Sequence, residues 1–336
     1  MVLLGVVGRM PGKILPVEHV EFLLQSRAAA LSLLDIWDSP TALLGAAGTE
    51  SHKLFTAVSG GMATIDAGPN ADVDVLSFSR RAGIAIEKKL GDAYFAIGPF
   101  TEFGGGKNKN KNIFSDYDDM AYSTTVCGKV EHAGIGILWR LVHGSGFFAD
   151  GDLCIGLARC DLDPEPTGAV LLGAEKIDPS AIESATKNFK MTCRDGAGRV
   201  GIGFDRQFEN WRLSLHSRYE WAHLANDRDY FPTESLDSSR WRSGFSLDRE
   251  GMGGVAPYVQ FIYEREFDGR GATGYFTYSE DFAPISMNLA GDCYVCELGV
   301  HFHRGNIRPL EVTVGVRGCA GMRRAIFGHF HLCYNF

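Results

Sequence analysis

Two histidine pairs hold the side chains in this sequence that are best suited to binding a metal: His301 with His303, and His329 with His331. Residues two apart on a strand share a face, and Glu311 lies in the segment between the pairs. Imidazole and carboxylate groups are zinc ligands. The two histidine pairs would lie on the first and third of three neighbouring strands, which stand about 10 Å apart. Zinc, however, binds its ligands at about 2 Å. We therefore expect no metal and no other cofactor, and interpret these histidines as a polar strand face.

A cysteine pair and a serine with a nearby histidine resemble reactive sites only in part. Cys293 and Cys296 have the spacing of a redox motif, but positions three apart on a strand face opposite sides. His143 and Ser145 lie in a His-Gly-Ser-Gly stretch that lacks the strand-to-helix turn of a nucleophile elbow. The sequence predicts no nucleophilic catalysis, and so no enzyme.

A stretch rich in glycine and lysine, residues 104–111, superficially resembles a phosphate-binding loop. That motif needs glycine at position 101 and serine or threonine after Lys107, where this chain has Thr101 and Asn108. We interpret the stretch as an exposed hairpin loop.

The charge and composition of the chain exclude several classes of protein. A net charge of −8 over 336 residues argues against a nucleic-acid partner, because proteins that bind nucleic acids usually carry a basic field. The 41 glycines and 22 phenylalanines suit a β-rich protein. No stretch approaches the roughly 18 uninterrupted apolar residues of a transmembrane helix. A mean hydropathy of −0.06 is also what a membrane barrel gives, because its two faces alternate.

The elements that carry these groups change character near residue 52. Before it, apolar residues recur at three- and four-residue steps over residues 17–36, which predicts a helix that ends at the Asp-Ser-Pro cluster of residues 38–40. After it, the pattern has period 2. From Ile326 to Phe336 the even positions are apolar and the odd positions are mainly polar, so one strand face is apolar and the other polar.

Twelve segments alternate in this way, and each is longer than the five or six residues, roughly, of an average soluble strand. Aromatic residues stand at their ends, which is typical of membrane interfaces. The segments run approximately over residues 53–65, 73–90, 92–104, 122–141, 145–161, 187–205, 209–223, 238–250, 255–268, 290–304, 308–320 and 323–336.

The connections between the segments alternate in length. Short turns on one rim, long loops on the other and an even number of strands are the arrangement of an outer-membrane barrel. We therefore predict an all-β fold, a twelve-stranded antiparallel transmembrane β-barrel. The short turns lie at residues 91–92, 144 and 305–306, and the long polar loops at 105–122, 161–187 and 268–291.

Eight charged residues fall on the polar face of these segments. In a barrel they would line the lumen, hydrate it and hold the helix or a polypeptide. In a soluble sandwich they would form the outer face instead, and we favour the lumen. Glu264 and Glu266 are the first candidates for contacts with the helix. The predicted lumen residues are Glu102, Arg218, Glu220, Arg242, Glu264, Glu266, Glu297 and Arg317.

Four stretches resemble, in order, the autotransporter β-domain family, the C-terminal pore of type V secretion. Residues 55–61 (FTAVSGG) are similar to the first strand of that family and residues 97–104 (IGPFTEFG) to the third. Residues 257–269 resemble a proline-tyrosine strand that ends in a glutamate-phenylalanine-x-glycine turn. Residues 315–324 resemble the closing hairpin, before a final strand that ends at Phe336.

The resemblance implies a domain layout and a function. Residues 1–16 would be a passenger remnant or linker, residues 17–51 a pore helix inside the lumen with its linker, and residues 52–336 the barrel. The barrel would insert in the bacterial outer membrane and export or anchor an N-terminal passenger, which we expect to be absent here, as is a recognisable signal peptide. The alternative is a cargo-less outer-membrane channel or structural barrel. A barrel hydrolase is less favoured, because only scattered candidates such as Asp150 and Asp152 are available for it.

The resemblance also implies partners. These are outer-membrane lipid, the barrel assembly machinery, periplasmic chaperones and the chain's own passenger, with the chain as a monomer. Phe336, together with Tyr334, would form the insertion signal that the assembly machinery reads. Eight cysteines are unusual for a barrel that folds through an oxidising periplasm.

Overall fold

The computed structural model describes residues 8–10, 13–15, 44, 51–68, 71–115, 121–163, 189–225, 235–249, 254–276, 282–304 and 310–336. The predicted pore helix over residues 17–36 lies outside the described residues. Within the described part of the chain, no helix has both the length and the apolar character needed to cross a membrane.

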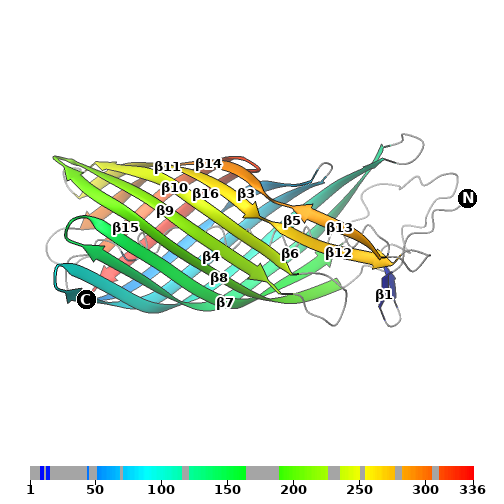
Figure 1. Ribbon diagram of the computed structural model, residues 1–336, viewed down its shortest axis with the longest axis horizontal. Coiled ribbons are helices and arrows are strands. Elements are labelled where there is room, and N and C mark those ends of the chain that lie inside the picture. The colour runs from blue at the N-terminus through cyan, green and yellow to red at the C-terminus, as the bar shows by residue number, and fades with distance from the viewer. Residues whose placement is uncertain are drawn as a thin grey trace, which may run out of the picture.

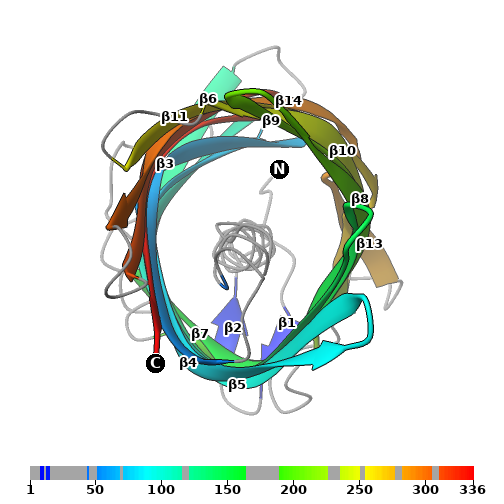
Figure 2. The same cartoon turned by 90° about the vertical axis from the view of Figure 1, so that its left-hand side faces the viewer.

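Twelve antiparallel strands close into one barrel (Figures 1 and 2). Each wall strand pairs with the next one along the chain, and pairing of β16 with β3 closes the circle. Closure pairs both edges of every wall strand, which a bilayer demands because it offers no water to bind backbone groups. The wall strands are β3 (Ser51–Gly68), β4 (Ala71–Leu90), β5 (Ala93–Ser115), β6 (Ala121–His143), β7 (Phe147–Asp163), β8 (Phe189–Phe208), β9 (Trp211–Leu224), β10 (Leu236–Arg249), β11 (Val255–Asp268), β14 (Gly291–Arg304), β15 (Leu310–Gly321) and β16 (Arg323–Asn335).

The two rims of the barrel differ. One rim carries short turns such as residues 91–92 and 144–146, and it also holds both ends of the barrel, because His52 and Phe336 exchange backbone hydrogen bonds of 3.1 and 2.9 Å. We call this the proximal rim, and the opposite one the distal rim. The number of wall strands and the predicted short turns at residues 91–92 and 144 are confirmed, whereas the one predicted at residues 305–306 lies outside the described residues.

The predicted exposed loop at residues 104–111 is wrong, because it lies inside strand β5. This strand continues to Ser115 and β6 begins at Ala121, so most of the predicted loop over residues 105–122 is strand. The glycine, asparagine and lysine residues here have low strand propensity. Propensity does not decide the outcome, because β4 and β6 pair with this stretch from both sides.

Two small hairpins stand apart from the wall. β12 (Arg270–Phe276) pairs with β13 (Phe282–Asn288) within the predicted loop of residues 268–291, and β1 (Gly8–Met10) pairs with β2 (Lys13–Leu15). Their strands are 3 or 7 residues long. A period of two does not stand out from the surrounding residues over so few positions, which is why the sequence did not indicate them.

The outer surface of the wall is apolar. In β3, Leu54, Val58 and Met62 are 48, 41 and 62% exposed, whereas Phe55 and Ala57 between them are fully buried. Large exposed apolar side chains recur on all twelve wall strands. On β3, β7 and β9 they extend over roughly ten residues, which for tilted strands gives a band about 25 Å tall. That height matches the apolar band of outer-membrane barrels.

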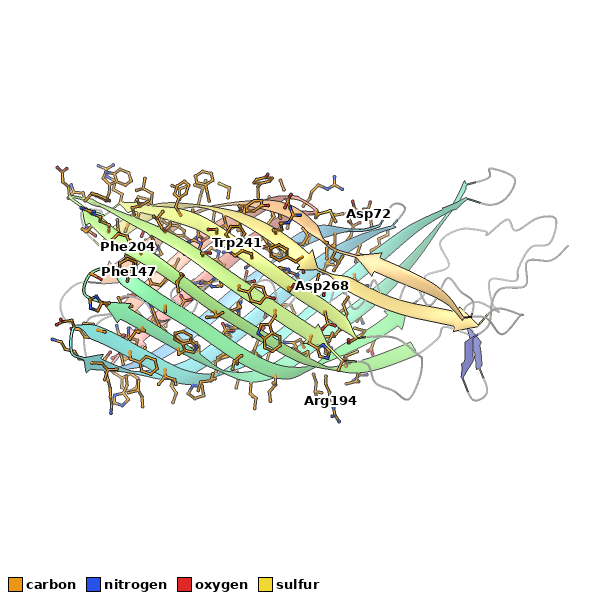
Figure 3. The ribbon with its side chains drawn as sticks, viewed as in Figure 1. Asp72, Phe147, Arg194, Phe204, Trp241 and Asp268 are labelled. Atoms are coloured by element: carbon orange, nitrogen blue, oxygen red, sulfur yellow. The ribbon has the colours of Figure 1, made fainter. Side chains whose placement is uncertain are left out.

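Exposed charged side chains of the outer surface lie at the proximal rim, as Lys88, Lys89 and Glu209 do, and also toward the distal rim (Figure 3). Asp72 and Arg194 lie toward that rim, while Phe147 and Phe204 pack together near the proximal rim. The centroids of these two rings are 4.9 Å apart. An apolar, aromatic band between two charged margins is the surface of a barrel that sits in a bilayer.

Candidate functional site: the barrel lumen

A belt of charged side chains lines the lumen about halfway between the rims. Opposite charges face each other across neighbouring strands, where they attract. This pairing is also what allows charged groups to be buried at all. The facing pairs are Arg81 with Glu102, Asp152 with Arg199, Arg242 with Glu264, and Glu297 with Arg317.

Arg81 of β4 is the centre of the first cluster in the belt, and it is 1% exposed. Its Nη2 donates to Glu102 at 2.7 Å, and its Nη1 reaches past two strands to donate to Asp152 of β7 at 3.2 Å. Its guanidinium lies 4.2 Å from the ring centroid of Phe100. Asp152 also pairs with Arg199 at 2.9 Å. Two arginines and two carboxylates therefore neutralise one another across four strands.

A second cluster lies on the opposite side of the wall, around Arg242 of β10. Its Nε donates to Glu264 at 2.6 Å and its Nη1 to Glu220 at 3.1 Å, so it connects β9 and β11. Glu264 also accepts a hydrogen bond from Arg323, which comes from β16. One carboxylate thus holds three strands together through two arginines.

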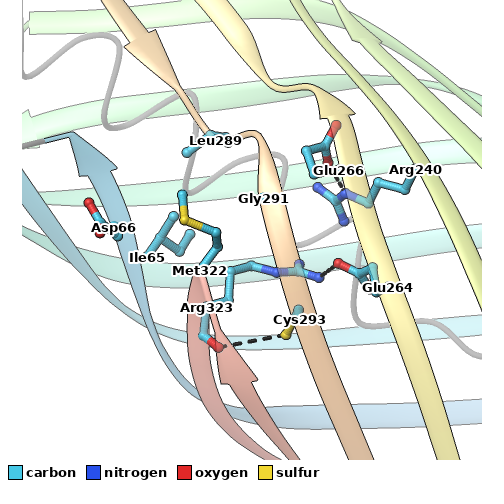
Figure 4. Close-up of a pocket in the computed structure, with 10 residues that line it drawn as sticks. All are labelled: Ile65, Asp66, Arg240, Glu264, Glu266, Leu289, Gly291, Cys293, Met322 and Arg323. Atoms are coloured by element: carbon cyan, nitrogen blue, oxygen red, sulfur yellow. Dashed lines mark hydrogen bonds and ion pairs between the residues drawn. The ribbon is translucent and has the colours of Figure 1, made fainter.

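A small cavity lies beside this cluster (Figure 4). It measures about 20 Å³, which is room for a single water molecule. Around it, Arg240 points to Glu266 and Arg323 points to Glu264. Because these charged groups are paired with one another, the cavity is a gap between ion pairs and not a ligand pocket.

A third cluster is centred on Glu297 of β14. Arg317 donates to its Oε2 at 2.8 Å, and the Tyr258 hydroxyl donates to its Oε1 at 2.6 Å. The Tyr258 oxygen also lies 3.0 Å from Nε2 of His329, and its ring stacks on His301 with 4.4 Å between centroids. Tyr258 therefore contacts both histidines. Among the described residues, no group of three or more His, Cys, Asp or Glu is placed to hold a metal ion.

Two glycines make room for the ring of Tyr258. A Cβ atom on Gly299 would come within 2.5 Å of the Tyr258 ring, and one on Gly315 within 2.6 Å of its hydroxyl. Only a residue without a side chain lets the ring lie this close to the wall. The glycines therefore set the position of the hydroxyl between Glu297 and His329.

One residue that precedes the wall strands lies inside the barrel. Leu44 is helical and fully buried. Its carbonyl oxygen accepts a hydrogen bond of 2.8 Å from Nζ of Lys53, which also pairs with Glu87 at 2.8 Å. Leu44 belongs to a buried apolar cluster with residues of five wall strands: Phe55, Ala57, Ala85, Ala96, Phe100, Leu138 and Cys154.

No family model matches the chain, and no curated protein matches it. Solved structures do. The transport unit of the autotransporter AIDA-I from Escherichia coli matches with a TM-score of 0.69 and 12% identity over 94% of this chain and 99% of that one. The translocator domain of autotransporter NalP from Neisseria meningitidis gives 0.59 and 13% over 94% and 98%. The beta domain of the Bordetella autotransporter Brka gives 0.59 and 12% over 85% and 99%. The chain has the fold of an autotransporter translocator barrel.

The translocator-type barrel places all eight charged residues predicted for the lumen on its inner wall. The structure brings all eight into direct ion pairs: Arg242 with Glu220 and Glu264, Arg317 with Glu297, Glu102 with Arg81, Arg218 with Asp150, and Glu266 with Arg240. Each of the eight is at most 7% exposed: Glu102, Arg218, Glu220, Arg242, Glu264, Glu266, Glu297 and Arg317.

Several lumenal groups of the translocator-type barrel were not identified from the sequence. Arg81 was not identified, because the adjacent Arg80 is also charged and obscures the alternation, although Ser77 and Ser79 precede it on the same polar face. Asp150 and Asp152 were considered only as hydrolase candidates, although two carboxylates at alternate positions also indicate an inner face. Lys53 gave no signal, because the inward neighbours in its strand are apolar.

The last strand ends at an exposed aromatic residue. Phe336 is 66% exposed, and its ring stacks on Tyr334 with 6.1 Å between centroids. It lies at the proximal rim, beside the start of β3. Both residues predicted as the insertion signal therefore stand together at the end of the seam where the barrel closes.

Proposed function

We propose that this chain is an autotransporter translocator: a barrel that inserts in the bacterial outer membrane and exports or anchors an N-terminal passenger. The observation that carries the proposal is the place of Leu44, inside the lumen and bonded to Lys53. A chain that lies in the lumen before the first wall strand is positioned to connect the barrel with a passenger. Likeness to the transport unit of AIDA-I supports the same function.

The orientation follows from the rims. Outer-membrane barrels have short turns on the periplasmic side, so the proximal rim faces the periplasm and the distal rim faces the cell exterior. The apolar outer band contacts lipid, and the chain acts as a monomer without a cofactor. Insertion depends on the assembly machinery and periplasmic chaperones, which read the end of β16. No bond chemistry is required, so the protein is not an enzyme.

The test is surface display by the full chain. A secretion signal and an epitope are attached before residue 1, and intact cells are treated with a protease. We expect the epitope to be cleaved from outside while a periplasmic marker stays intact. The matched control carries the same signal and epitope without the barrel, and its epitope should resist the protease. An epitope protected in cells whose barrel migrates faster unboiled than boiled would exclude export.

A cargo-less channel is the second candidate, and the half-buried polar residues inside the proximal half of the barrel favour it. In that case the refolded full chain conducts ions steadily in a planar bilayer but displays no epitope. A translocator instead displays the epitope and stays nearly closed, because Leu44 already fills part of the lumen.

A further inference from the structure

Two cysteines lie on the inner wall between the charged belt and the distal rim. Cys293 precedes Glu297 by four residues on β14, and Cys319 follows Arg317 by two residues on β15. Residues an even number of positions apart share a strand face, so both cysteines point into the barrel with these lumenal charges. Cys293 is 2% exposed and Cys319 is half-buried.

The two thiols contact each other across the strand pair. In the register of β14 and β15, Cys293 faces Gly321 and Cys319 faces Val295, so the two cysteines are diagonal neighbours. The Cys319 thiol donates a hydrogen bond to the sulfur atom of Cys293. The Cys293 thiol in turn donates to the carbonyl oxygen of Arg323 at 3.7 Å. Thiols are weak donors and acceptors, so these bonds place the two sulfur atoms side by side without holding them firmly.

The diagonal arrangement suits a bridging metal ion better than a disulfide. Diagonal neighbours on antiparallel strands have Cα atoms about 7–8 Å apart, whereas a disulfide usually joins Cα atoms about 4.4–6.8 Å apart. A direct bond between the sulfur atoms would therefore require the backbone to move. An ion between them lengthens the link to two metal–sulfur bonds, each about 2.3 Å long in the case of zinc, and needs no such movement.

The groups around the thiols favour a soft cation over a hard one. The small cavity of Figure 4 is lined by two sulfur-containing side chains, Cys293 and Met322. Two carboxylates at the same cavity, Glu264 and Glu266, are paired with arginines, so a hard cation would have to displace those arginines. Asp66 lies on the other side of Met322 from Cys293 (Figure 4). Sulfur ligands select soft ions such as Cu(I).

We propose that Cys293 and Cys319 form a two-thiol site that binds one soft monovalent cation, such as Cu(I) or Ag(I), between their sulfur atoms. Ions of this kind can be held by two thiolates alone, whereas a structural zinc takes four ligands. On binding, two S–H bonds break, two metal–sulfur bonds form and two protons pass to the solvent. No electron is transferred, and the complex carries one negative charge.

Positive groups near the two thiols compensate this negative charge. Arg323 acts electrostatically on both thiols, Arg242 on that of Cys293 and Arg317 on that of Cys319, against the carboxylate of Glu264. The bound ion would join β14 to β15 near the distal rim. Because a ligand that binds the folded state opposes unfolding, we expect the ion to stabilise the barrel.

The first experiment measures retention of Ag(I), which needs no reductant to stay monovalent. The refolded full chain is loaded with Ag(I) in detergent and washed with an excess of glutathione, a monothiol competitor, and the retained ions are counted by native mass spectrometry. We expect Cys293→Ser and Cys319→Ser each to retain one ion fewer than the native chain. Their affinity at this site should fall about a hundredfold, because the second thiol of a pair acts within the same molecule. Cys333→Ser is the matched control, since it removes another buried, inward cysteine and should retain as many ions as the native chain.

The second experiment measures stability. Faster migration of unboiled than of boiled samples first confirms that each variant is folded, and Cys319→Ala replaces Cys319→Ser if the latter is not. Ag(I) should then raise the urea concentration at the midpoint of unfolding for the native chain and for Cys333→Ser, but not for the Cys319 variant. Equal retention and equal midpoint shifts in all variants would overturn the proposal. A disulfide between Cys293 and Cys319 in the untreated native barrel, found by mass spectrometry of its peptides, would overturn it as well.

Discussion

The Nζ atom of Lys53 lies 2.8 Å from the carbonyl oxygen of Leu44 and 2.8 Å from a carboxylate oxygen of Glu87. One ammonium group therefore ties Leu44 to both β3 and β4. Lys53 is 1% exposed and Glu87 is 3% exposed, so neither partner has water as a substitute. A buried charge pair of this kind costs little while it is complete and much when one member is removed.

Replacing Lys53 by methionine should weaken the attachment of Leu44 to the barrel wall. Lys53→Met keeps the aliphatic stem but frees the Leu44 carbonyl and leaves Glu87 without its cation, which costs about 3–5 kcal/mol in the barrel. We expect higher ion conductance of the refolded full chain in a planar bilayer and faster cleavage before residue 51 by an added protease.

A double variant separates the two effects. Lys53→Met with Glu87→Gln removes the uncompensated charge, so the stability of the barrel should recover while the conductance stays high. Lys89→Met, at an exposed position of β4, is the matched control and should change neither. Conductance equal to that of the native chain in both Lys53 variants would mean that the hydrogen bond from Lys53 does not hold Leu44 in the lumen.

Neighbouring arginines of β4 should respond in opposite ways to the same substitution. Arg81 faces the lumen and pairs with Glu102 and Asp152, whereas Arg80 is exposed on the outer face. Arg81→Met leaves buried carboxylates with less compensation and should lower the free energy of unfolding by about 3–5 kcal/mol. Arg80→Met removes a charge from the lipid-facing surface and should be neutral or stabilising by up to about 2 kcal/mol. Urea unfolding in lipid vesicles, followed by tryptophan fluorescence, measures both. Similar losses for the two variants would contradict the assignment of the faces.

The twelve wall strands were predictable from the sequence because alternation is a local property. Each strand shows its two faces within a few residues, as Leu54 and Phe55 do, and no knowledge of the partner strand is needed. The alternation also placed Glu264 and Glu297 on the inner wall. Where both faces of a strand are apolar, the alternation did not show which face is inward. Lys53, two positions before Phe55, therefore gave no indication of a buried ion pair.

Relationships between distant strands were not predictable. The pair of Arg81 and Asp152 joins residues on β4 and β7, so it depends on barrel curvature. The helical conformation of Leu44 was also missed, because the sequence at residues 38–40 was interpreted as the end of a helix. A serine followed by a proline is equally the start signal of one, as an N-cap and a first helical residue.

A methyl group on Gly315 should disturb the Glu297 cluster. It would come within 2.6 Å of the Tyr258 hydroxyl and within 2.5 Å of the His329 ring, so the tyrosine must leave its place between Glu297 and His329. Overpacking of this kind costs about 1–3 kcal/mol, and the same urea titration should show it. Gly318→Ala in the same strand is the matched control, since nothing lies within 4 Å of the added atom. A loss of stability that is equal for Gly315→Ala and Gly318→Ala would show that the effect is general to glycines of β15.

The end of β16 should matter for assembly in the cell but not for folding in the test tube. Phe336 is 66% exposed at the proximal rim, so its ring adds little to packing within the barrel. Phe336→Ser should therefore refold in detergent as efficiently as the native chain, with the same shift between boiled and unboiled samples. In cells, we expect it to lower the amount of assembled barrel several-fold, because the assembly machinery would read this residue. Phe330→Ser is the matched control, since Phe330 is an outward aromatic residue of the same strand and is 39% exposed. Equal assembly defects in the two variants would show that lost apolar surface, and not a terminal signal, limits insertion.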